Sequence, residues 1–131
     1  MGAKMGSGTN ALNWFEIPVK DMDRAVKFYQ TIFEISMERM EIGGMTMAMF
    51  PTDFTTGVVG GGLVKSEMHI PSETGSVIYL NANPDLDLVL NRIGSAGGSV
   101  VMPKTLIDEQ TGYMAFFNDT EGNRVALHSN A

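Results

Sequence analysis

The chain carries the same order of hydrophobic and polar positions twice. In each copy a strand-like stretch leads into an aspartate-containing turn, an amphipathic helix and several short strand-like segments. Residues 22–33 are predicted to form the first helix, because apolar side chains recur every three or four positions along one face. Asp21 precedes this helix and suits its N-cap. The second predicted helix covers residues 86–96 and stops at Gly97 and Gly98, which favour a left-handed C-terminal turn.

Alternating side chains and turn residues predict four strands in each copy. In the first copy the strands are expected over residues 14–19, 36–42, 45–50 and 58–64, with a hairpin turn at Gly43 and Gly44. In the second copy they are expected over residues 77–81, 99–102, 113–118 and 124–128, after a linker over residues 67–75.

Two such copies predict an α+β fold. Each copy is a βαβββ module, about residues 12–66 and 76–129, and neither small sheet can close alone. The modules are therefore expected to form a cup-shaped, partly open mixed β-sheet barrel with the helices outside. We expect a flexible leader over residues 1–10 and a single domain over residues 11–131, with function located in the shared cavity.

The alternation along each strand also predicts which side chains face that cavity. In the first strand Phe15, Ile17 and Val19 should lie under the helices, while Trp14 and Glu16 point the other way. The same reasoning gives the second copy a cavity face that carries polar or titratable groups, namely Tyr79, Asn81, Arg124 and His128.

Composition narrows the classes of partner. The chain has 131 residues, a formal net charge of −6 and no cysteine. The negative charge argues against nucleic acid or an anionic membrane surface as a partner. Without cysteine, neither a disulfide framework nor a thiolate zinc site is possible. No apolar run approaches the roughly 20 residues that cross a bilayer, so the default expectation is a soluble cytoplasmic protein without a membrane partner.

Three segments resemble the vicinal oxygen chelate superfamily, which includes glyoxalase I, bleomycin-resistance proteins and extradiol dioxygenases. They are residues 15–29 (FEIPVKDMDRAVKFY), residues 96–98 (AGG) and residues 119–127 (DTEGNRVAL). The resemblance covers nearly all of residues 12–129 and includes the duplication. It implies the cup-shaped fold, a small-molecule ligand and a homodimer, but no particular reaction, because the superfamily hosts many chemistries and some non-enzymes.

The resemblance also locates the family's metal site. Catalytic members hold a divalent metal with His or Glu side chains from the first and last strands of each copy. Those four positions correspond here to Trp14, Gly62, Val77 and Ala126, none of which is a metal ligand. We therefore expect no metal and no other cofactor, and no classical metal-dependent glyoxalase I activity.

The candidate catalytic residues are Glu16, His128 and Tyr79. Glu16 lies two residues beyond Trp14, and His128 lies two beyond Ala126, each on the predicted cavity face. A carboxylate between tryptophan and apolar neighbours suits a general base, and an imidazole nearby could exchange protons with it. This set would suit proton abstraction from a carbon next to a carbonyl group, with Tyr79 assisting.

The candidate ligand-binding residues are Trp14, Asn81, Met47, Arg124 and Gln110. Arg124 could hold an anionic ligand, although a salt bridge to a carboxylate of the neighbouring turn is the commoner arrangement. Gln110 belongs to the polar segment 104–111, which is either a solvated loop or a lid over the cup. His69, in the linker, is expected to be exposed.

Three functions remain open from the sequence. The first is a glyoxalase-like lyase or isomerase that acts on a small oxygenated metabolite without the usual metal. The second is a non-catalytic protein that sequesters an antibiotic or other hydrophobic ligand, as bleomycin-resistance proteins do; Met45, Met47 and Met49 would give it an adaptable lining. The third is a regulatory domain whose cup is filled by its own side chains.

Overall fold

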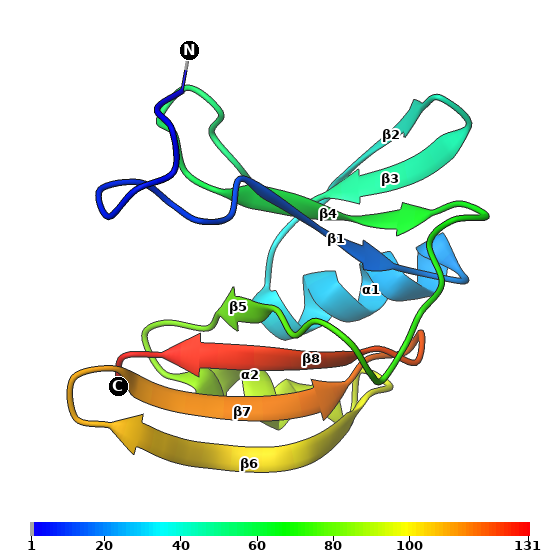
Figure 1. Ribbon diagram of the computed structural model, residues 1–131. Coiled ribbons are helices and arrows are strands. Elements are labelled where there is room, and N and C mark those ends of the chain that lie inside the picture. The colour runs from blue at the N-terminus through cyan, green and yellow to red at the C-terminus, as the bar shows by residue number, and fades with distance from the viewer. Residues whose placement is uncertain (1) are drawn as a thin grey trace.

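The computed structural model describes residues 2–131 and contains two four-stranded mixed sheets, each accompanied by one helix (Figure 1). The first module comprises β1 (Trp14–Pro18), α1 (Met22–Phe33), β2 (Glu38–Ile42), β3 (Met45–Met49) and β4 (Gly60–Lys65). The second comprises β5 (Tyr79–Asn81), α2 (Leu86–Ile93), β6 (Ser99–Asp108), β7 (Gly112–Asn118) and β8 (Arg124–Ser129). The predicted α+β fold of two βαβββ modules is confirmed, and the two sheets do not close into one barrel.

The two sheets have the same strand order, as a duplicated sequence predicts. The first has the order β1-β4-β3-β2 and the second β5-β8-β7-β6. In each sheet the first and last strands of the module pair in parallel, with Phe15 opposite Gly61 and Leu80 opposite Leu127. The ring of Phe15 lies over Gly61. A Cβ atom at position 61 would come within 2.4 Å of that ring, so the position suits glycine.

Both helices begin where the sequence predicts. The carboxylate of Asp21 accepts a hydrogen bond from the backbone N–H of Arg24 (3.1 Å), and α1 covers the predicted residues. Asp85 caps α2 in the same way. This helix ends at Ile93, earlier than predicted, and Gly97 then adopts the left-handed conformation that its lack of a Cβ atom permits. Neither helix has the length and hydrophobicity that a bilayer crossing requires.

The core lies between the sheets and the helices and is continuous across the two modules. The side chains predicted to face the helices are buried in it, including Ile17, Val19, Leu80, Ala82, Val125 and Leu127. The helices α1 and α2 also contact one another at the centre of the molecule (Figure 1). The opposite faces of the sheets, which carry Trp14, Glu16 and Arg124, are therefore left free to line hollows.

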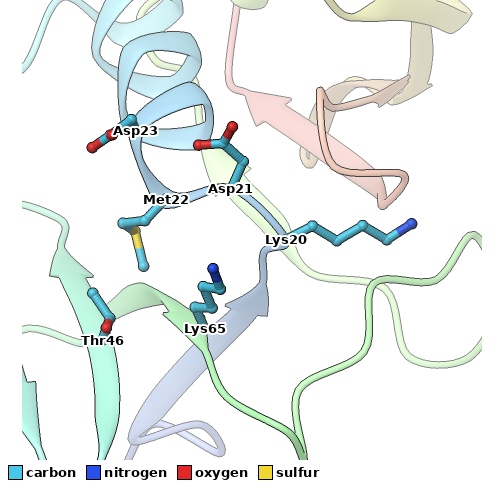
Figure 2. Close-up of a pocket in the computed structure, with 6 residues that line it drawn as sticks. All are labelled: Lys20, Asp21, Met22, Asp23, Thr46 and Lys65. Carbon is cyan, nitrogen blue, oxygen red and sulfur yellow. The ribbon is translucent and has the colours of Figure 1, made fainter.

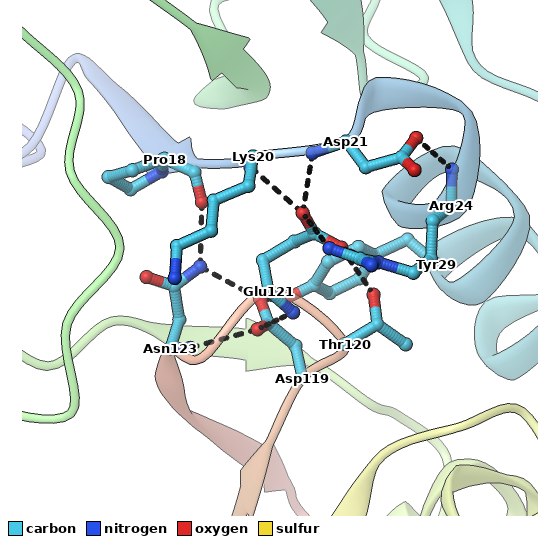
Figure 3. A network of polar contacts seen from close by, with 9 residues as sticks. All are labelled: Pro18, Lys20, Asp21, Arg24, Tyr29, Asp119, Thr120, Glu121 and Asn123. Carbon is cyan, nitrogen blue, oxygen red and sulfur yellow. Dashed lines mark hydrogen bonds and ion pairs between the residues drawn. The ribbon is translucent and has the colours of Figure 1, made fainter. Parts of the chain in front are cut away.

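A polar network around Glu121 joins the two modules (Figure 3). Its carboxylate accepts hydrogen bonds of 2.8 Å from the backbone N–H groups of Lys20 and Asp21, and pairs with the Arg24 guanidinium at 2.7 Å. Burial alone would raise the pKa of Glu121, but the hydrogen bonds from Arg24 and the backbone outweigh it and lower that pKa to about 2. The charged carboxylate therefore stabilises the junction between the modules.

Two further contacts complete this junction. The buried Tyr29 hydroxyl donates a hydrogen bond to Asp119 (2.7 Å), and the Asn123 side chain donates one to the Pro18 carbonyl (2.7 Å; Figure 3). The turn that follows β7 connects two strands of one sheet. Its polar residues also hold the start of α1, so they form the contact between the modules.

Residues 104–111 were predicted to form either a lid or a solvated loop, and both predictions are wrong. Residues up to Asp108 belong to β6, which pairs with β7 along ten residues despite irregular register, and only the short turn to Gly112 connects the strands. The polar side chains of this segment led to the error, because an edge strand with exposed faces has no alternation of buried and solvated positions. The strand β5 is also shorter than predicted and begins at Tyr79.

Candidate active site

Glu16 is held in place on β1 by two donors. The indole N–H of Trp14 donates to Oε2 of Glu16 (3.2 Å), and the Nε2 atom of His69 lies 2.8 Å from Oε1. About a third of the Glu16 side chain (33%) and less of the His69 side chain (19%) is exposed. Both carboxylate oxygens therefore have a fixed direction, while the group stays accessible from one side.

His69 is in turn held by Ser66. The Ser66 hydroxyl lies 2.6 Å from Nδ1 of His69, and its oxygen accepts a hydrogen bond from the Met68 backbone N–H (3.1 Å). The hydroxyl proton can then point to Nδ1, which leaves the Nε2 proton for Glu16. A neutral imidazole satisfies every group in this chain of hydrogen bonds.

The expectation that His69 is simply exposed is wrong. Because β1 and β4 are parallel, the linker leaves the sheet at the end where β1 also finishes, and a turn from Ser66 to His69 brings the imidazole back to Glu16. The spacing of Ser66 and His69 could have indicated a local turn. No local signal could have identified the contact with Glu16, which is 53 residues away in sequence.

A hollow of about 220 Å³ lies between the modules, next to Glu16. Strand β1 contributes Glu16 and Ile17, the linker contributes Ile70 and Ser72, and the start of β8 contributes Arg124. A lining of apolar and hydroxyl side chains, with one carboxylate and one guanidinium, is the composition of a small-molecule site.

Arg124 lies in this hollow without an acidic partner. Its guanidinium lies over the ring of Phe116 (6.0 Å to the centroid), and its Nε atom is buried with no hydrogen-bond partner. Among residues 2–131, no carboxylate lies within ion-pair distance of Arg124. The salt bridge expected with the neighbouring turn does not form, because Asp119 and Glu121 are bonded to α1 and the residues before it.

The other candidate catalytic residues lie on the second sheet. Tyr79 packs edge-on against Phe116 (5.9 Å between centroids) and is half exposed. His128 is the register partner of Asn81, and its Nε2 atom lies 2.6 Å from the Thr111 carbonyl oxygen. His128 is four residues from Arg124, which is about 13 Å along a strand. The imidazole that contacts Glu16 is thus that of His69, and His128 lies at the far end of β8.

The remaining candidate ligand-binding residues do not gather around Glu16, and Asn81 lines another cleft together with Tyr79. Trp14 packs against Phe54 (6.2 Å between centroids) and contacts Glu16. Met47 is buried within the first sheet. Asn81 accepts hydrogen bonds from the backbone and side chain of Asn83. Gln110 is exposed in the turn between β6 and β7.

The residues present do not fit the superfamily's metal site. The side chains of Gly62, Val77 and Ala126 supply no donor atom at the expected positions, and the only polar atom of the Trp14 side chain is an N–H group that donates to Glu16. Across the described part of the chain, no three His, Asp or Glu side chains gather as metal ligands would.

Two further hollows lie elsewhere. A cleft of about 680 Å³ separates the loop after β3 from the start of α2, and is lined by Phe15, Phe50, Leu80 and Leu88 among others. A hollow of about 420 Å³ lies beside the first turn of α1, where two lysines and two aspartates surround Met22 and Thr46 (Figure 2). Its mixed charges neutralise one another, so it has no clear preference for an anion or a cation.

Comparisons with known proteins agree with this architecture. A family model described as the Glyoxalase/Bleomycin resistance protein/Dioxygenase superfamily matches residues 11–127. A glyoxylase-like domain-containing protein from Didymella fabae is 27% identical over 118 residues, which cover 88% of this chain and 91% of the relative.

Solved structures share the fold at lower identity. A glyoxalase/bleomycin resistance protein from Albidiferax ferrireducens T118 superposes with a TM-score of 0.69 at 16% identity, covering 93% of this chain and all of that one. A mutant glyoxalase I from Zea mays gives a TM-score of 0.69 at 20% identity, covering 91% of this chain and 45% of the maize chain. At these identities the structures support the fold, and the reaction has to be inferred from the site.

Proposed function

Because the chain belongs to the Glyoxalase/Bleomycin resistance protein/Dioxygenase superfamily, we propose that it is a glyoxalase-like lyase or isomerase that acts by proton transfer on a small oxygenated metabolite. The reaction would proceed without the superfamily's usual metal, since the donor atoms for that metal are missing.

The observation that supports this proposal is the Glu16 carboxylate, which faces a hollow between the modules while Trp14 and His69 hold both of its oxygens. A carboxylate with a fixed direction and an open side is suited to act as a general base. It would take a proton from a carbon next to a carbonyl group, and the electron pair of that C–H bond would move to the carbonyl oxygen as an enolate. Return of the proton to another carbon or to the other face would give an isomer.

Exchange of substrate protons with solvent deuterium tests this proposal without knowledge of the product. We expect the protein to accelerate deuterium incorporation into at least one of pyruvate, 2-oxobutyrate and hydroxyacetone, followed by proton NMR. Glu16→Gln should lower that rate by about 10²- to 10⁴-fold, because a general base contributes on that order. The control is Glu41→Gln, an exposed glutamate on β2. Equal exchange rates for the wild type and Glu16→Gln would refute the role of Glu16.

The second candidate function is non-catalytic binding of an antibiotic or other hydrophobic ligand, a function of the bleomycin-resistance type. The 680 Å³ cleft favours it, because drug-sized ligands occupy hollows of about 300–1,000 Å³ with mostly apolar walls. A ligand found by a thermal-shift screen would then bind equally well to Glu16→Gln, whereas Leu88→Asp in the cleft would weaken its binding.

We also propose that the chain is a homodimer in the cytoplasm. Large apolar side chains are exposed around the candidate site, including Phe54, Met68 (90% exposed) and Ile70. Light scattering during size-exclusion chromatography would test the dimer, and a monomer at all concentrations would refute it.

A further inference from the structure

We propose that Arg124 binds the carboxylate of a small monoanionic organic acid in the hollow between the modules. This inference names the substrate class of the candidate site, and it rests on the proposed function only for the fate of the bound acid.

The lack of a counter-ion distinguishes Arg124 from the other arginines. Arg24, Arg39 and Arg92 each pair with a carboxylate. Arg124 has no such partner within residues 2–131, although its Nε atom is buried and its side chain is only partly exposed. A guanidinium stays charged at any physiological pH, so its buried Nε–H group without an acceptor is unfavourable. An acceptor brought by a ligand would remove this penalty.

The carboxylates near Arg124 are already bound elsewhere. Glu121 accepts the N–H groups of Lys20 and Asp21 and pairs with Arg24. Asp119 accepts hydrogen bonds from Tyr29 and Asn123. Across the hollow, Glu16 is held by Trp14 and His69. Glu73, next to Ser72, accepts a hydrogen bond from Asn118. Because these carboxylates are bonded to other groups, an anion from outside the chain would complement Arg124.

The chemistry of the lining selects the kind of anion. A planar guanidinium matches a carboxylate with two parallel hydrogen bonds. Arg124 is the only cationic side chain among the residues that line the hollow, and Glu16 on the opposite side would repel a second negative charge. A monoanion is therefore favoured over a phosphate dianion.

The other residues that line the hollow determine the size and polarity of the ligand that it can hold. Ile70 and Ile78 offer apolar contact for a short carbon chain, the hydroxyl groups of Ser72, Thr74 and Ser76 add polar contact, and the volume of about 220 Å³ limits the size of the ligand. With its carboxylate on Arg124, such an acid would direct its neighbouring carbon atoms across the hollow toward Glu16. The two charged residues would thus bind and deprotonate different parts of one molecule.

Calorimetric titration with defined probes tests the inference. The monoanions are acetate, 2-oxobutyrate and benzoate, the neutral comparison is 2-oxobutanamide, and the dianion is inorganic phosphate at pH 8. We expect at least one monoanion to bind, and 2-oxobutyrate to bind more tightly than its amide. Arg124→Gln should weaken monoanion binding by about 10- to 100-fold, the loss expected for a charge-assisted hydrogen bond.

Two variants and one NMR signal distinguish a loss of ligand binding from a loss of protein folding. Arg124→Lys keeps the charge but not the planar fork, so it should retain part of the affinity. Arg39→Gln, which removes an exposed arginine on β2, should retain all of it. In the wild type the NMR signal of the Arg124 Nε–H group should shift on addition of the bound monoanion.

Several results would overturn the inference. These are the absence of binding by all three monoanions, equal affinity for 2-oxobutyrate and its amide, tighter binding of phosphate, or unchanged affinity in a folded Arg124→Gln variant. A different pattern would refute the proposed function alone: Arg124-dependent binding of a monoanion, with equal deuterium exchange by the wild type and Glu16→Gln. The two proposals can therefore fail separately.

Discussion

The Nε2 atom of His69 and the Oε1 atom of Glu16 lie 2.8 Å apart, although the two residues belong to the linker and to the first strand. Together with the hydrogen bond from Trp14, this contact fixes the orientation of the Glu16 carboxylate. It also makes the linker a part of the candidate site, and not only a covalent connection between modules.

Substitution of His69 should impair the reaction through the orientation of Glu16. His69→Ala removes a donor to Oε1, and we expect the deuterium-exchange rate to fall by up to about 10²-fold, as misplacement of a reacting group does. His69→Gln can donate a hydrogen bond from a similar position, and should restore part of the rate. Equal rates for the alanine variant and the wild type would show that Trp14 alone is sufficient to hold the carboxylate.

The polar network around Glu121 should make the free energy of unfolding depend on pH. The pKa of Glu121 is lowered to about 2 in the folded protein from an ordinary value of 4.5. The resulting stabilisation is fully present above pH 4.5 and is lost as pH falls toward 2. A shift of this size corresponds to about 3 kcal/mol in the free energy of unfolding.

Urea unfolding at a series of pH values would measure this effect. Glu121→Gln should be less stable than the wild type by about 3 kcal/mol at pH 7, and the difference should shrink between pH 4.5 and 2. The matched control is Asp23→Asn, which breaks an ion pair between exposed side chains and should change stability little. A constant difference at all pH values would contradict the assignment of the stabilisation to the Glu121 charge.

Tyr29 should not ionise before the protein unfolds. Burial raises the pKa of this tyrosine well above its usual value, and the charge of Asp119 raises it further. In an alkaline titration followed by ultraviolet absorbance, we expect Tyr29 to ionise only when the protein unfolds. Tyr29→Phe should destabilise the protein by about 1–3 kcal/mol, because Asp119 loses a buried donor.

Because the Phe15 ring lies so close to Gly61, position 61 should not tolerate a larger residue. Gly61→Ala would place a Cβ atom 2.4 Å from the Phe15 ring, and we expect a loss of about 1–3 kcal/mol from overpacking, measured by chemical unfolding. Gly94→Ala is the control, because no atom lies within 4 Å of the Cβ position there. Similar stability for both variants would indicate that the Phe15 ring moves aside freely.

The fold was predictable where local pattern and burial coincide. The periodicity of residues 22–33 identified α1, and the alternation around Ile17 identified the buried face of β1, because both elements place one face in the core. The pattern failed for β6, whose residues are mostly exposed and whose pairing with β7 is interrupted by register shifts.

The candidate site was predictable only in part. Glu16 was identified as a cavity-facing carboxylate, since strand alternation is a local property. The partner of Glu16 depends on where the linker runs, and the isolation of Arg124 depends on the bonds that Glu121 and Asp119 make with another module. Contacts between residues 50 to 100 positions apart are decided by the packing of whole elements, and no short pattern records them.

The duplicated halves meet at two corresponding places, and the two places are joined differently. Where the turn containing Glu121 reaches the start of α1, charged and peptide groups join the halves, whereas the loop after β3 leaves a 680 Å³ gap before the start of α2. Beside this gap the halves are joined by Arg92 of α2, which donates a hydrogen bond to the Ile32 carbonyl and pairs with Glu34 after the end of α1. Equivalent positions of the duplication thus hold a buried polar network in one place and an open cleft flanked by a partly exposed ion pair in the other.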